Sequence, residues 1–140
     1  EVAHELLMNA MYDAPVDSEG KPKYALNRKA DLRLPEGEQP VLKIASDGSK
    51  LCMQVTDPFG AFRRERVFSG LARGLDGGQL DTSHGGAGLG LTVIHNGSAA
   101  LFIDVVAGKR TEVTCVFEMD TQHRDFRLQP KSLHYFYREP

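Results

Sequence analysis

The chain has 140 residues, of which 41% are hydrophobic and 26% are charged, and its formal net charge is −2. This length and composition fit one globular domain, residues 1–140, with a core large enough to fold alone. Apart from an arginine-rich patch at 63–66, predicted to be a solvated helix face, the basic residues are dispersed, so no nucleic-acid partner is expected. No apolar stretch approaches the roughly eighteen residues of a membrane span, so we expect no membrane segment within this sequence.

The first predicted element is a helix over residues 2–11. Its apolar residues recur at helical spacing, and Pro15 ends the pattern. Glu5 and Asn9 are four residues apart and therefore share one face of this helix. Because the helical pattern is already running at Glu1, we expect a domain excised from a longer protein.

A turn-rich stretch and then a β-hairpin are predicted next. Residues 14–40 are rich in Pro, Gly, Lys, Glu and Asp, which is typical of turns and loops. Residues 41–44 and 51–56 have the composition of strands, and the Ser-Asp-Gly-Ser segment at 46–49 between them favours a hairpin turn. The second strand delivers Asp57 to the start of a loop.

The remaining elements are two helices and a second hairpin. Apolar residues at helical steps predict a helix over 63–75, and a polar, Gly-rich connector leads to another over 91–95. Residues 100–107 and 112–119 predict two strands joined at Gly108 and Lys109. The order of these elements favours an α+β fold with a layer of helices over a largely antiparallel sheet.

The cysteines and histidines give little sign of a metal site. Cys52 and Cys115 lie in apolar, strand-like runs far apart in the sequence, which favours buried thiols in a reducing, cytoplasmic compartment. The His4-Glu5 pair is similar to a phosphoacceptor motif, an interpretation we do not favour. It also fails the H-E-x-x-H zinc motif, because Met8 occupies the second ligand position.

A glycine run is the most informative motif of the sequence. Gly86, Gly88 and Gly90 stand at every second position, and an apolar helical pattern follows directly through Leu89 and Leu91. Glycine lets backbone N–H groups approach an anion closely, and the positive end of the following helix points at it. The spacing matches neither the dinucleotide fingerprint nor a P-loop, yet it predicts a phosphate-binding loop.

Three separated motifs together indicate a family. They are the Glu5 and Asn9 pair on a helix, Asp57 and Gly60 at a strand end, and the glycine run at 86–91. This combination resembles the ATP-binding domain shared by gyrase-type ATPases, heat-shock chaperones, sensor histidine kinases and mismatch-repair ATPases, the GHKL or Bergerat fold. The resemblance covers residues 2–118. It implies a two-layer α/β sandwich, with helices over one mixed, largely antiparallel sheet.

The resemblance also implies roles for individual residues. Asn9 would hold Mg²⁺ through its amide oxygen, and Glu5 would act as a general base toward the attacking hydroxyl. Asp57 would accept a hydrogen bond from the adenine amino group, supported by Thr111 in the last hairpin. The implied ATP-binding residues are Asn9, Asp57, Gly60, Gly86, Gly88, Leu89, Gly90, Leu91 and Thr111, with ATP and Mg²⁺ as cofactors.

The sequence departs from the family pattern at two places. Phe59 and Ala61 occupy the positions where the second motif usually has glycines, and Phe59 would pack either beside the adenine or in the core beneath the loop. Tyr12 stands where histidine kinases often have lysine, and Asp13 where anti-sigma kinases have histidine. Neither subfamily is matched fully.

The resemblance further implies an ATP lid between the second and third motifs. The segment is about two dozen residues long, and Gly74, Gly77 and Gly78 are expected as its hinges.

The closest pattern is that of the anti-sigma-factor serine kinases. It implies transfer of the γ-phosphate to a protein partner such as an anti-anti-sigma factor, a sigma factor or a response regulator, and it allows a homodimer. Two alternatives stay open. One is the catalytic ATP-binding domain of a sensor histidine kinase, and the other is a non-catalytic module that keeps the fold for protein contacts.

Overall fold

The computed structural model describes residues 1–29, 31–75, 89–120 and 122–140. Among these residues, none of the helices combines the length and the apolar character needed to cross a bilayer. The described elements in chain order are α1 (Val2–Met8), the π-helical turn η1 (Asn9–Asp13), the short helical turn η2 (Glu36–Glu38), β1 (Val41–Ser46), β2 (Lys50–Asp57), α2 (Arg64–Leu75), α3 (Leu89–Gly97), β3 (Ala100–Val106), β4 (Arg110–Glu118), α4 (His123–Leu128) and β5 (Ser132–Arg138).

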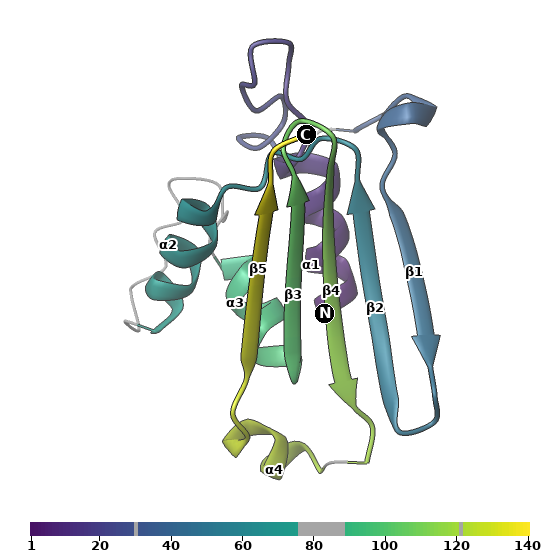
Figure 1. Cartoon of the computed structure of the whole chain (residues 1–140), viewed down its shortest axis with the longest axis vertical. Coiled ribbons are helices and arrows are strands. Elements are labelled where there is room, and N and C mark those ends of the chain that lie inside the picture. Colours follow the sequence, from purple (N-terminus) through teal and green to yellow (C-terminus); the bar gives the residue numbers. More distant parts are fainter. Residues whose placement is uncertain (30, 76–88, 121) are drawn as a thin grey trace.

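The strands form one mixed sheet with the order β1-β2-β4-β3-β5. Neighbouring strands are antiparallel except at one edge, where β5 runs parallel to β3. Figure 1 shows α1 and α3 on one face of the sheet, with α2 beside α3 near the β5 edge. The predicted α+β class, with helices over a mixed and largely antiparallel sheet, is therefore confirmed at this level.

The core lies between β3 and the helices. Leu101, Ile103 and Val105 alternate along β3 and are completely buried, in one cluster with Leu91 and Ile94 of α3. A strand alternates its side chains between two faces, so these three residues share the face that meets the helices. Burial of each such side chain stabilises the fold by about 1.5–3 kcal/mol.

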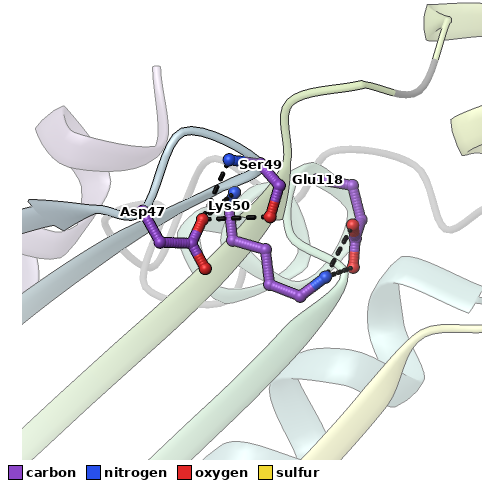
Figure 2. Close-up of polar contacts among 4 residues, drawn as sticks. All are labelled: Asp47, Ser49, Lys50 and Glu118. Carbon is purple, nitrogen blue, oxygen red and sulfur yellow. Dashed lines mark hydrogen bonds and ion pairs between the residues drawn. The ribbon is translucent and has the colours of Figure 1, made fainter.

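The first hairpin turns where the sequence predicts, and its side chains fix the register (Figure 2). The Asp47 carboxylate accepts hydrogen bonds from the N–H groups of Ser49 at 2.9 Å and Lys50 at 2.7 Å, and from the Ser49 hydroxyl at 3.0 Å. These bonds hold the pKa of Asp47 below its usual value. Lys50 then pairs across to Glu118 at 2.9 Å. With this end of β2 fixed, its other end brings Asp57 opposite Thr111 on β4.

The N-terminal helix ends differently from its prediction. The α-helix stops at Met8, and the chain continues as the π-helical turn η1, in which the Ala14 N–H donates to the Asn9 carbonyl five residues earlier at 2.9 Å. The helical path thus ends just before Pro15, whose ring cannot continue it. Such wider turns are frequent at functional sites.

The C-terminal tail contains two elements that the sequence analysis leaves unassigned. α4 leads into β5, which pairs with β3 and places Leu133 across from Leu101 and Tyr135 across from Ile103. The strand also carries the half-exposed Phe136 on its opposite face, so its sequence lacks a clean alternation. Its assignment depends on pairing with a distant strand, which local periodicity does not report.

Gly74, expected as a lid hinge, lies inside α2. A Cβ atom at this position would come within 2.3 Å of Thr92 Oγ1 on α3, so glycine is required where the two helices pack together. Gly77 and Gly78, the other expected hinges, lie outside the described residues.

Both cysteines are free thiols. Cys115 is completely buried on β4, and burial raises its pKa to about 12. Cys52 on β2 is half-buried. The predicted placement of both residues in strands is confirmed, and the protonated Cys115 thiol acts as a small core side chain.

Candidate functional site

A cavity opens between the helical layer and the ends of β2 and β4. Its walls are mostly apolar, with Leu6, Leu91 and Ile94 on the helical side. The cavity volume is about 50 Å³, and the whole empty space, which includes open solvent, is about 710 Å³. A few polar groups on apolar walls are typical of ligand sites. The polar lining residues are Asn9, Asp13, Asp57, Arg66 and Thr111.

Asp57 is the buried carboxylate at the end of β2. It is 6% exposed, and its Oδ1 accepts the N–H of Phe59 at 2.9 Å. Burial raises the pKa of Asp57 from 3.8 to about 6, although the N–H groups of Phe59 and Gly60 and the hydroxyl of Thr111 oppose this rise. At neutral pH the cavity therefore contains a poorly solvated negative charge, which favours a ligand with a hydrogen-bond donor.

Thr111 supplies a second polar group at the same place. It lies directly across from Asp57 in the β2–β4 register and is 1% exposed. Its hydroxyl lies close enough to lower the pKa of Asp57, yet it falls short of a formed hydrogen bond, and within the described residues Oγ1 has no partner. A buried hydroxyl without a partner is costly, so a ligand that completes its hydrogen bonding would be favoured here.

Gly60 shapes the lip beside Asp57. Its φ of 58° is left-handed, and a Cβ atom would come within 2.1 Å of the Val106 carbonyl oxygen. The Gly60 carbonyl accepts the N–H of Gly108 in the β3–β4 turn at 3.3 Å. Only glycine lets the loop after β2 lie this close to that turn.

The first and third motifs meet where α1 packs against the start of α3. A Cβ atom on Gly90 would come within 2.4 Å of Glu5 Oε2 and 3.6 Å of Asn9 Oδ1. The absence of a side chain at Gly90 therefore lets the first turn of α3 approach the carboxylate and the amide. Two further residues of the run, Gly86 and Gly88, lie outside the described residues.

The α3 helix begins at Leu89, so its first turn carries the last part of the glycine run. Leu91, in the same first turn, is buried and lines the cavity. The structure thus brings most of the predicted site together. Asn9, Asp57, Leu91 and Thr111 line the cavity, and Glu5 lies close to Gly90.

Three polar residues at the site were not singled out as site residues by the sequence analysis. Asp13 is buried at the end of η1, and burial raises its pKa against the opposing effect of Arg28. Arg66 lines the cavity and its charge also lowers the pKa of Asp13. The spacing of Asp13 four residues after Asn9 could have indicated a shared face, whereas nothing in the sequence connects Arg28 to this helix.

Among the described residues, the aromatic side chain that lines the cavity is that of Phe62 and not that of Phe59. Phe62 and Ala61 both line the cavity, and the Phe62 carbonyl accepts the Tyr135 hydroxyl at 2.9 Å. Phe59 is half-buried and contributes its backbone N–H to Asp57. The loop after β2 is therefore anchored both to Asp57 and to the edge strand β5.

Over 1–29, 31–75, 89–120 and 122–140, no group of three or more His, Cys, Asp or Glu side chains could hold a metal ion. The oxygen atoms of Asn9 and Glu5 beside Gly90 are hard ligands of the kind that Mg²⁺ takes together with phosphate oxygens and water. No protein-family model matches the chain, and no curated protein or solved structure matches it significantly.

Proposed function

We propose that this chain binds ATP with Mg²⁺ in the cavity and transfers the γ-phosphate to a hydroxyl group of a protein partner. The observation that carries the proposal is the pair of buried polar groups at one end of the cavity: the Asp57 carboxylate, and the Thr111 hydroxyl that has no partner among the described residues. Glu5 and Asn9 lie against the start of α3, and Asn9 also lines the cavity. The GHKL resemblance implies a role for all four residues.

Asp57 and Thr111 suit an adenine ring. The carboxylate would accept a hydrogen bond from the exocyclic amino group, and the Thr111 hydroxyl would bond a ring nitrogen or a bridging water. The apolar walls from Leu6, Phe62 and Ile94 would cover the faces of the ring. A nucleobase that presents a carbonyl at the same place would meet the negative charge of Asp57 unpaired, so the site favours adenine.

Asn9 suits the metal end of the site. Its Oδ1 lies 3.6 Å from the position that a Cβ atom of Gly90 would take, so the amide oxygen lies beside the first turn of α3. Mg²⁺ held by Asn9 and the phosphates supplies neutralisation of their negative charge. The N–H groups at the start of α3 would bind phosphate oxygens.

Glu5 suits the role of general base. The acceptor hydroxyl oxygen would form a bond to the γ-phosphorus while the bond from that phosphorus to the bridging oxygen breaks, and ADP leaves. Glu5 would take the hydroxyl proton, because its carboxylate lies beside Gly90 together with the Asn9 amide that would hold the metal. The resemblance to anti-sigma-factor kinases makes a serine or threonine of a signalling partner the proposed acceptor.

Thermal unfolding with ATP, ADP and a non-hydrolysable ATP analogue, each with and without Mg²⁺, tests the proposal. A nucleotide at a hundred times its dissociation constant should stabilise the chain by about 2.7 kcal/mol, and more with Mg²⁺ present. Asn9→Ala should remove the effect of the metal and leave metal-free binding in place. Equal losses with and without Mg²⁺ would reject Asn9 as the metal ligand.

A non-catalytic interaction module is the second candidate function. It is favoured by Ala61 at the lip of the cavity and by Phe59 beside it, where the resembled motif has glycines. This candidate predicts no stabilisation by millimolar nucleotide. A histidine kinase domain would instead bind ATP but yield an acid-labile phosphohistidine, whereas a phosphorylated hydroxyl is stable in acid.

A further inference from the structure

A partly buried arginine from outside the three motifs contacts two polar residues of the cavity lining, Asn9 and Asp13. Arg28, in the connection between η1 and β1, donates from Nε to Asp13 Oδ1 at 3.3 Å and pairs through Nη2 with Asp13 Oδ2. The same Nη2 donates to Asn9 Oδ1 at 3.2 Å. The side chains of Arg28 and Asp13 are 18% and 11% exposed. The guanidinium is thus mostly removed from water and bonded to the oxygen that we assign to Mg²⁺.

The π-helical turn makes this arrangement. Asn9 and Asp13 are the first and last residues of η1, and both side chains reach the same guanidinium. Asp13 anchors Arg28 through two of its nitrogen atoms, while the amide of Asn9 supplies a neutral acceptor. An ion pair with Asp13 alone would explain a neutralised carboxylate, but it would not explain the additional bond to Asn9.

The charge at this end of the cavity requires a cation if a triphosphate binds. Glu5 and Asp13 bring two carboxylates to the neighbourhood of Asn9, and both would repel phosphate groups. A guanidinium has five N–H donors in a planar fork that matches phosphate oxygens, and Nη1 adds two donors to those that already bond Asp13 and Asn9. Arg28 therefore has the charge and the donors for an anion at the place where the glycine run begins α3.

We propose that Arg28 is a phosphate-binding residue, held in position by Asp13, whose guanidinium exchanges the Asn9 oxygen for a phosphate oxygen when the nucleotide binds. This exchange frees Asn9 Oδ1 for Mg²⁺, so the metal and the arginine do not compete for it. The inference rests on the proposed function, because it takes ATP as the ligand. It makes Arg28 a residue that distinguishes a triphosphate from a nucleoside.

Binding of Mg²⁺-ATP and of adenosine to Arg28→Gln, measured by calorimetry, tests the inference. Loss of a charge-assisted hydrogen bond should weaken ATP binding by about tenfold or more, while adenosine binding should change by less than about twofold. Arg28→Lys keeps the positive charge but lacks the planar guanidinium, so its affinity for ATP should lie between those of the original chain and Arg28→Gln. Arg33→Gln removes the same charge from an exposed position nearby and should bind both ligands as the original chain does.

The outcomes separate this inference from its alternatives. Equal losses for ATP and adenosine would make Arg28 a neutraliser of Asp13 and overturn the inference. An ATP-selective loss in Arg66→Gln, with Arg28→Gln unaffected, would assign the phosphate to Arg66 instead. If the chain without substitutions binds neither ATP nor adenosine, the proposed function is overturned as well.

A second variant distinguishes loss of ATP binding from loss of the fold. Arg28→Gln alone leaves the Asp13 carboxylate buried without its partner, which destabilises the fold. Combining it with Asp13→Asn removes both charges together, and thermal unfolding without nucleotide shows whether the fold is kept. The double variant should show the same ATP-selective loss, and ATP binding equal to that of the original chain would overturn the inference.

Discussion

Replacing Asp57 by asparagine should stabilise the fold at neutral pH and remove the proposed recognition of adenine. Burial raises the pKa of Asp57 from 3.8 to about 6, so at neutral pH the folded chain holds a charge that its surroundings disfavour. A carboxyl group whose pKa is higher in the folded chain stabilises the fold below its unfolded pKa. That contribution is lost as the pH rises through the folded pKa.

The size of the effect follows from the two pKa values. At about 1.36 kcal/mol per pH unit, a rise from 3.8 to about 6 corresponds to about 3 kcal/mol of stability lost between acid and neutral pH. Asparagine has nearly the same shape, can keep the hydrogen bond from the Phe59 N–H, and can donate to the Thr111 hydroxyl. At neutral pH, the free energy of unfolding of Asp57→Asn should therefore exceed that of the original chain by up to about 3 kcal/mol. At about pH 4 the two should differ little.

Denaturant unfolding from about pH 4 to about pH 8 measures this difference. Asp47→Asn is a control of opposite sign, because hydrogen bonds from Ser49 and Lys50 lower the pKa of Asp47 (Figure 2). Its carboxylate stabilises the fold above its unfolded pKa, so its replacement should destabilise the chain at neutral pH. A loss of stability in Asp57→Asn at neutral pH, or a gain that does not change with pH, would refute the reasoning.

Three further substitutions test other parts of the site. Gly60→Ala should lower the free energy of unfolding by at least about 3 kcal/mol, because its Cβ would come within 2.1 Å of a backbone oxygen. Gly48→Ala is the control: it has open space around it, so only backbone strain of about 1 kcal/mol should lower its stability. Gly74→Ala should lower stability by about 1–3 kcal/mol, because its Cβ would clash with Thr92 where α2 packs on α3. Adding Thr92→Ala should restore most of the lost stability. A double variant that is as unstable as Gly74→Ala would show that this contact is not the cause. Glu5→Gln should leave nucleotide-induced stabilisation unchanged and abolish transfer of the γ-phosphate from ATP to the protein hydroxyl. Unchanged transfer would exclude the proposed general-base role.

Local sequence patterns predict most of the elements correctly. The alternation of Leu101, Ile103 and Val105 indicates β3, and the Asp47 turn is found where its residues favour it. Both signals come from residues within a few positions of one another, so they need no knowledge of distant neighbours. Local patterns do not predict the parallel strand β5, because its pairing partner, β3, lies about thirty residues earlier in the sequence.

The motifs also predict which residues meet, but not their environments. The resemblance predicts that Asp57 and Thr111 act together, and the β2–β4 register places them opposite each other. The same resemblance gave no indication that the Thr111 hydroxyl would be buried without a partner among the described residues. Hydrogen-bond satisfaction depends on every atom that packs around a group, and most of those atoms belong to other elements.

By itself, the sequence determined the kind of elements, the hairpin turns and the motifs that carry the proposed nucleotide site, because these depend on the periodicity and on residue types within short segments. Only the tertiary structure decided that Arg28 contacts Asn9 and Asp13, that Gly90 approaches Glu5, and that the Asp57 carboxylate is desolvated. These properties follow from burial and from contacts between distant segments, which exist only once the helices pack on the sheet.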